Sequence, residues 1–230
     1  PAMGIETMFG MGNKTNQPIR PMVEMAGAYD GGIATLSHGL MAGTRVASNL
    51  GWRAIDALAV GDSVLTFDHG MQDITEIRQA HMWLDAPDTA EAIWPVVIPA
   101  GALGNREELV LLPDQGVMVE SDAAAELHGD PFAILTVHSL VGQRGIYRRQ
   151  PMQRVTLSAV YFAHDEVIYA EGGALIHCPV DMSTLDRFLS AAAPTYTVLS
   201  GPEAEELALY MQIEDNMGFA APAAEAYASF

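Results

Sequence analysis

Cysteine and long apolar runs are both scarce in this sequence. Cys178 is the single cysteine, which excludes an internal disulfide and a C-x-x-C metal knuckle. No window reaches about 18 consecutive apolar residues, and the first residues lack a basic stretch followed by an apolar one. We therefore expect neither a membrane span nor a signal peptide, and a protein that is cytoplasmic at synthesis.

Basic residues are also scarce, with 11 Lys and Arg against 29 Asp and Glu and a net charge of -18. A field of this sign repels phosphate backbones and anionic lipids, so we expect neither nucleic acid nor membrane as a partner. The carboxylates are scattered rather than grouped in a loop such as an EF-hand. The sequence therefore predicts no metal site, and no residue pattern indicates a cofactor.

Half of the residues are hydrophobic, which is typical of a globular chain, and three segments differ in pattern. Residues 1–36 are rich in Gly and Met and show no sustained period. Methionine adapts well at contact surfaces, so we predict an arm that binds a protein partner or a second copy of the chain. A floppy tail is the alternative. Residues 37–180 are β-rich, and residues 181–230 form a helical extension.

Short apolar alternations separated by turn signals predict the strands of the middle segment. The predicted strands are 45–48, 63–67, 75–83, 94–98, 109–112, 116–120, 133–137, 154–162 and 166–170. Turn residues between them, such as Asp68-His69-Gly70, favour tight hairpins.

Two short helices are predicted in the C-terminal segment. Leu185, Phe188 and Leu189 share the i, i+3, i+4 spacing of one helix face. In the second helix, Ser200 and Glu203 have the spacing of a capping box, and Pro202 falls in the first turn. Its apolar face contains Ala204, Leu207, Ala208 and Met211, and its end is predicted at Gly218.

Three segments occur in an order that is typical of one family. The first runs from Gly43-Thr44 through Val60-Gly61-Asp62 to Asp68, the second is Pro95-Val-Val-Ile-Pro-Ala-Gly-Ala-Leu-Gly104, and the third, Tyr161 to Gly172, contains Glu166-Val-Ile-Tyr-Ala-Glu-Gly. Together they resemble the Hint (hedgehog/intein) domains of a bacterial subgroup common in alphaproteobacteria. The resemblance implies a mainly β fold, a horseshoe of bent antiparallel hairpins, and the residue patterns add the N-terminal arm and two short C-terminal helices. Members of the family cut their own backbone.

The residues that would perform this self-cleavage are absent from the matching positions. The family pattern Cys-x-x-x-Gly-Thr places the attacking cysteine on Gly39, which has no side chain. The Thr/Ser-x-x-His motif that protonates the departing nitrogen falls on Leu112 and Gln115. A third histidine position falls on Ala159. The resemblance therefore implies a site without its catalytic groups.

Other polar residues allow more than one interpretation. Ser37 and His38 are candidates for a relocated nucleophile with its own base, or belong to a polar loop. His164, Asp165 and Glu166 form either an acid-base cluster or, as we favour, a turn between strands.

His138, His177 and Cys178 lack the spacing of a known metal site. We interpret His138 as a core or hairpin histidine. Cys178 lies near the boundary where inteins keep a second nucleophile, but no Asn follows it, so we expect an ordinary thiol.

These observations favour a catalytically inactive Hint-fold protein that acts as a structural or protein-interaction module in a larger, exported or particle-associated assembly. The alternative is an autoproteolytic domain that uses an atypical nucleophile near Ser37. A conventional enzyme is disfavoured because the sequence contains no phosphate loop, nucleophile elbow or zinc signature.

Overall fold

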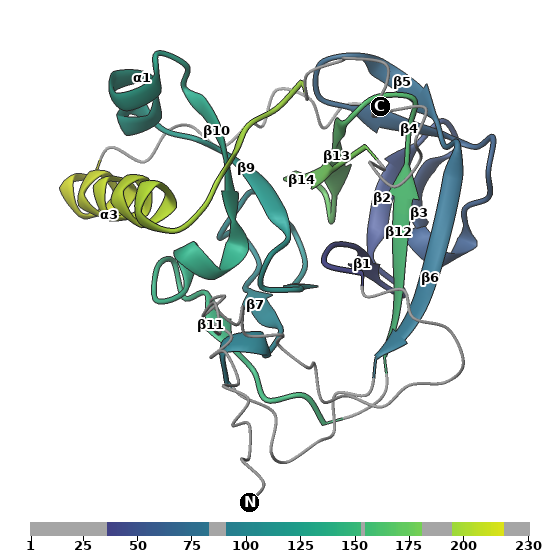
Figure 1. Ribbon diagram of the computed structural model, residues 1–230, viewed down its shortest axis with the longest axis horizontal. Helices are drawn as coiled ribbons and strands as arrows, with labels where there is room; N and C mark the ends of the chain where they lie inside the picture. Colours follow the sequence, from purple (N-terminus) through teal and green to yellow (C-terminus); the bar gives the residue numbers. More distant parts are fainter. Residues whose placement is uncertain (1–35, 83–90, 153–154, 181–194, 219–230) are drawn as a thin grey trace, which may run out of the picture.

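The computed structural model describes residues 36–82, 91–152, 155–180 and 195–218, which form two sheets and two α-helices (Figure 1). One sheet has six strands. In order across the sheet they are β11 (Tyr147–Arg148), β7 (Val96–Ile98), β8 (Leu109–Leu111), β1 (Leu40–Met41), β12 (Val155–Tyr161) and β6 (Glu76–Met82), with β8 and β1 in the middle.

The second sheet has nine strands. Eight follow the order β15 (Val198–Leu199), β10 (Phe132–Thr136), β9 (Gly116–Glu120), β14 (Ala174–Cys178), β13 (Glu166–Ala170), β2 (Arg45–Ser48), β4 (Ser63–Thr66) and β5 (Gly70–Asp73), and β3 (Gly51–Ala54) pairs with β2. Every pairing is antiparallel except that of β10 with β15. The predicted fold class, mainly β with antiparallel hairpins, is confirmed.

All the predicted strands are present, but six further strands were not predicted. Three of the missed strands, β1, β11 and β15, have two residues each and are too short to show an alternation. β14 is longer, yet its sequence Ala-Leu-Ile-His-Cys is nearly continuous in apolar residues because the strand is enclosed in the sheet. Short 3-10 turns also connect the strands: η1 (Ile55–Ala57), η2 (Glu91–Ile93) and η3 (Val137–Leu140).

Helix α1 (Asp122–His128) was not predicted, although its ends have clear signals. Ser121 is the N-cap and its side chain accepts a hydrogen bond from Ala124 N. Gly129 ends the helix with a φ of 80°. The helix is only seven residues long, so its apolar spacing gave no sustained period.

Helix α3 (Pro202–Met217) confirms the predicted second C-terminal helix, including its end at Gly218. The predicted capping box is wrong. Gly201 is the N-cap, with a φ of 57°, and no side chain caps the helix. The positive φ of Gly201 turns the chain so that Ser200 lies outside the helix start. The predicted helix around residues 183–189 and residues 1–35 of the predicted arm lie outside the described residues.

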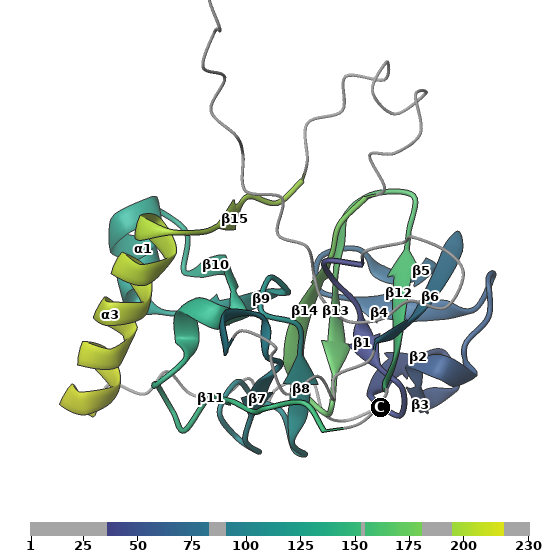
Figure 2. The same ribbon diagram turned by 60° about the horizontal axis from the view of Figure 1, so that its bottom comes forward.

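Helix α3 shares its core with the sheets and is tied to α1 (Figure 2). Its buried side chains are Ala204, Leu207, Ala208 and Met211. Glu214 accepts hydrogen bonds from Ser121 Oγ, at 2.9 Å, and from Ala123 N, at the N-terminus of α1. Within the described part of the chain, no helix is long and apolar enough to cross a membrane.

Glu171, which has a φ of 44°, joins the first motif segment to the third and to the residues that directly follow the second. Its carboxylate accepts a hydrogen bond from Arg45 N at 2.6 Å, and its own backbone bonds to Arg45 O and Arg106 N. Gly104 and Gly173 pack so closely that a Cβ at Gly173 would collide with Gly104 O. The motif residues therefore hold the backbone of the domain together.

Candidate functional site

Gly39 lies directly before β1, the short strand between β8 and β12. Leu40, the next residue, pairs with Leu111 on one side and Ser158 on the other. Gly39 is buried and has a φ of 142°, and a Cβ added there would lie 3.3 Å from Ser158 O. The backbone at this position therefore favours glycine over any residue with a side chain.

The side chain of Gln115 reaches the backbone of Gly39. Its Oε1 accepts a hydrogen bond from Gly39 N at 2.8 Å, and its Nε2 donates to His177 O at 2.7 Å and to Gly116 O at 3.1 Å. Gln115 is 1% exposed, so these bonds satisfy a buried carboxamide. A carboxamide holds the amide nitrogen in place but has no proton to transfer near neutral pH.

Leu112 and Ala159 belong to one small apolar cluster beside Gly39. Its buried members are Leu36, Leu112, Leu157, Ala159 and Tyr161. The ideal Cβ of Gly39 would lie 3.5 Å from Ala159 N, and Gln115 N donates to Leu112 O at 3.0 Å. The structure thus brings together all four positions that the family pattern identified, although they come from distant parts of the sequence.

The fallback residues Ser37 and His38 lie at the edge of this cluster. Ser37 is exposed and His38 is partly buried. The His38 ring meets the Tyr161 ring edge to face, with centroids 5.5 Å apart and an interplanar angle of 84°. The contact with Tyr161 therefore gives His38 a structural role.

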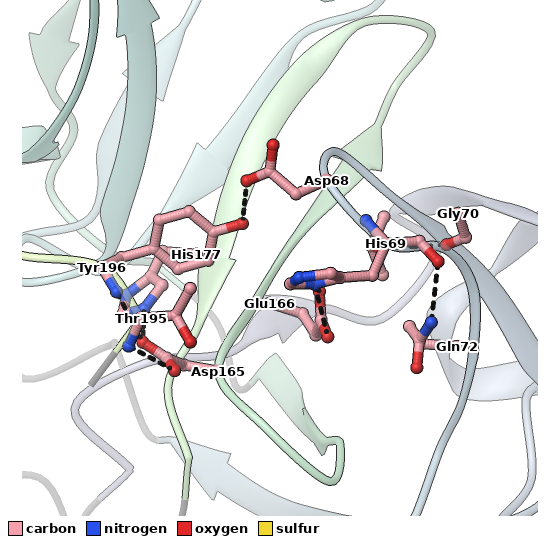
Figure 3. A network of polar contacts seen from close by, with 10 residues as sticks. Asp68, His69, Gly70, Gln72, Asp165, Glu166, His177, Thr195 and Tyr196 are labelled. Carbon is pink, nitrogen blue, oxygen red and sulfur yellow. Dashed lines mark hydrogen bonds and ion pairs between the residues drawn. The ribbon is translucent and has the colours of Figure 1, made fainter. Parts of the chain in front are cut away.

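The adjacent residues His164, Asp165 and Glu166 diverge at the start of β13. His164 is exposed in the turn after β12, as predicted, whereas both carboxylates are buried. Asp165 accepts hydrogen bonds from Thr195 N and Tyr196 N, and Glu166 contacts His69 Nδ1 at 3.0 Å (Figure 3). The three residues do not form one acid-base cluster.

A polar network joins β13, β14, the β4–β5 turn and the segment before β15 (Figure 3). Tyr196 Oη donates to Asp68 at 2.5 Å, and His177 Nε2 lies 3.8 Å from Asp165. Burial alone would raise the pKa of Asp165. The N–H groups of Thr195 and Tyr196 donate to its carboxylate and have the larger combined effect, so the pKa lies below its ordinary value. Burial lowers the pKa of His177, which favours the neutral ring despite its acidic neighbour.

Cys178 follows His177 and pairs with Glu166 in the β13–β14 register. Burial and the Glu166 charge raise the pKa of the thiol to about 12. Because the thiolate is the reactive form, this cysteine is an inert core residue.

His138 lies in η3, not in a hairpin or the core, and its Nδ1 is 3.1 Å from Pro113 O. Across the described residues, no group of three or more His, Cys, Asp and Glu side chains is placed to hold a metal ion.

Sequence reasoning considered His177 only as a metal ligand and missed that its backbone carbonyl accepts a hydrogen bond from Gln115. His177 acts through its backbone carbonyl and therefore leaves no side-chain signal.

A family model described as "Hint domain" matches residues 38–175. We found no curated protein sequence that matches the chain. Solved structures with similar folds include a splice-inactive variant of the AceL NrdHF class 3 split intein, with 13% identity, a TM-score of 0.42, and coverage of 63% of this chain and 99% of that one. The gp41-1 intein has 12% identity, a TM-score of 0.40, and coverage of 61% and 98%. An intein-like domain from Clostridium thermocellum has 13% identity, a TM-score of 0.36, and coverage of 60% and 97%.

Proposed function

This chain belongs to the Hint domain family, and we propose that it is a catalytically inactive member that acts as a structural or protein-interaction module in a larger assembly. Its sequence motifs favour the bacterial subgroup common in alphaproteobacteria. The observation that carries the proposal is the hydrogen bond from Gly39 N to Gln115 Oε1. It joins the expected nucleophile position to the expected proton-donor position, and neither residue supplies its group.

Self-cleavage needs a nucleophile on the side chain next to the bond and a proton for the departing nitrogen. Glycine has no nucleophilic side chain. The Gln115 carboxamide accepts a hydrogen bond from Gly39 N and donates one to His177 O. The apolar side chains of Leu112 and Ala159 occupy the remaining positions. These substitutions support the loss of both chemical steps rather than one.

The backbone conformation supports the same proposal. A single reversion to cysteine at position 39 would place a Cβ against Ser158 O in a conformation that favours glycine. The site is therefore adapted to glycine. Replacement of one catalytic residue in an otherwise active protein would not explain this adaptation.

The alternative is autoproteolysis with Ser37 as the nucleophile, and one observation supports it. Ser37 is exposed beside His38, two residues before Gly39. A serine and a histidine near the expected cleavage position are the elements of a nucleophile with a base.

Intact mass spectrometry of the full-length chain decides between the two. The chain is incubated at neutral pH with and without a strong thiol, beside a Ser37→Ala variant. We expect an unchanged mass of 24.6 kDa in all samples. Two fragments whose masses sum to that of the chain plus one water, or plus one thiol after thiolysis, would overturn the proposal if the cut lies beside Ser37 to Gly39. A Ser37 nucleophile would break the bond between Leu36 and Ser37. Loss of that cut in Ser37→Ala would then identify the nucleophile.

A further inference from the structure

Helix α3 has a second apolar stripe besides the one that it buries. We call this the outer stripe, and its members and exposed fractions are Leu209 (56%), Tyr210 (43%), Ile213 (44%) and Met217 (65%). Leu209, Ile213 and Met217 follow one another at four-residue steps, and Tyr210 precedes Ile213 by three. Side chains with this spacing lie along one side of a helix.

The outer stripe points away from the core. Ile213 follows the buried Met211 by two residues, which is a rotation of about 200° around a helix of 3.6 residues per turn. Figures 1 and 2 both place α3 at the rim of the molecule, beside α1. Four large apolar side chains on one exposed side of a helix are more than the isolated exposed residues of an ordinary surface.

The charge on α3 indicates what covers the stripe. The helix contains Glu203, Glu205, Glu206, Glu214 and Asp215 and no basic residue. Glu214 and Asp215 already have partners in the chain: Glu214 accepts a hydrogen bond at the start of α1, and Asp215 pairs with Arg144. Glu206 precedes Leu209 by three residues and Tyr210 by four, so it borders the outer stripe.

A second copy of the chain fits this surface poorly. Two α3 helices would bring together acidic side chains that have no basic residue on either helix to pair with, and each chain has a net charge of -18. A partner with apolar residues flanked by Lys or Arg complements both the stripe and the charge at its border.

We propose that the outer stripe of α3 docks a basic amphipathic helix of another protein. Such a helix has apolar residues at i, i+3, i+4 and i+7 and basic residues beside them, and it packs along α3 by side-chain interdigitation. This inference rests on the proposed role as an interaction module and assigns that role a surface and a class of partner.

The test uses a defined peptide and the full-length chain. The peptide has about 18 residues, or five helical turns, with Leu along one face and Lys beside it. A second peptide has Glu in place of every Lys. Binding is measured by fluorescence anisotropy at about 0.15 M salt, where the screening length of about 8 Å weakens diffuse attraction.

Two double variants separate docking on α3 from general attraction to an acidic protein. Leu209→Ser with Ile213→Ser alters the outer stripe. Leu50→Ser with Val60→Ser is the matched control, because it removes the same kind of side chains from exposed positions elsewhere. All four positions are exposed, so both variants should fold, and thermal unfolding checks this.

We expect the Lys peptide to bind, the Glu peptide to bind at least about tenfold more weakly, and the outer-stripe variant to weaken binding at least about tenfold. The control variant should bind like the unsubstituted chain. Equal weakening by both variants, or no binding, would overturn the proposal. A dimer in sedimentation that the outer-stripe variant dissociates would assign the surface to a second copy instead. Intact mass of the same samples keeps the two proposals separable: an unchanged mass without peptide binding rejects only the docking site.

Discussion

Gly39 and Gln115 are 76 residues apart in sequence and are joined by a hydrogen bond of 2.8 Å from the Gly39 N–H to Gln115 Oε1. The other end of the same carboxamide donates to His177 O on β14. The Gln115 side chain thus links the residue before β1, in the six-stranded sheet, to β14 in the nine-stranded sheet. Gln115, which the sequence resemblance assigns to the proton-donor position, joins the two sheets here as a clamp.

Substitution of this clamp should destabilise the protein strongly. Gln115→Leu keeps the approximate volume but leaves Gly39 N without its acceptor and removes the donor to His177 O. An unsatisfied buried polar group costs about 1–3 kcal/mol, so we expect the free energy of unfolding to fall by about 2–4 kcal/mol in urea titrations. The exposed Gln212→Leu in α3 is the control, with an expected change within about 0.5 kcal/mol. Similar losses in both variants would contradict the clamp.

A methyl group at Gly39 should cost more than one at a neighbouring glycine. Gly39→Ala combines a φ of 142° with a Cβ 3.3 Å from Ser158 O, and we expect a loss of about 3 kcal/mol. Gly43 has a φ of 88° but open space around its Cβ, so Gly43→Ala should cost about 1 kcal/mol. Chemical denaturation of both variants measures the difference. Equal costs would show that close packing against β12 contributes nothing.

The role of Glu171 can be divided into a hydrogen bond and an ion pair. Glu171→Gln keeps an oxygen for Arg45 N but removes the charge and the oxygen that accept from the Arg45 guanidinium. Because that side chain is 49% exposed, we expect a loss below about 1 kcal/mol. Glu171→Ala also removes the acceptor and should cost about 2–3 kcal/mol. Thermal unfolding followed by circular dichroism compares the two. A Gln variant as unstable as the Ala variant would assign the stabilisation to charge.

Buried His177 should make the protein less stable in acid. Its pKa is lowered in the folded chain, so below the ordinary value of 6.5 the unfolded chain binds a proton more readily. Stability should therefore fall as the pH drops through and below about 6.5. The neighbouring Asp165 reduces this effect. His69, whose pKa is raised by its hydrogen bond to Glu166, acts in the opposite direction, but its side chain is 45% exposed and its contribution is small.

The measurement is urea unfolding from about pH 8 to about pH 5. His177→Phe should lose much of the decline in stability between about pH 6.5 and pH 5, and its ring would still pack against Tyr196. The exposed His128→Gln is the control and should keep the decline. An unchanged pH profile in His177→Phe would show that another group causes the acid sensitivity.

Local sequence patterns accounted for much of the architecture. In β12, for example, Val155, Leu157 and Ala159 alternate with Thr156 and Ser158, and this alternation is a property of neighbouring residues. The ordered motifs likewise identified the family and pointed to Gly39, Leu112, Gln115 and Ala159, which the fold then brings together. The residue types at those positions, and hence the absence of a cysteine and of histidines there, are also a matter of sequence alone.

The tertiary structure decided what depends on distant partners. β1 has two residues and is a strand only because β8 and β12 pair with it on either side. The separation of Asp165 from Glu166 follows from the opposite directions of successive side chains, and their partners, the Thr195–Tyr196 backbone and His69, come from other segments. The bond from Gly39 to Gln115 arises in the same way, because folding places a turn beside a strand start that no local pattern connects to it.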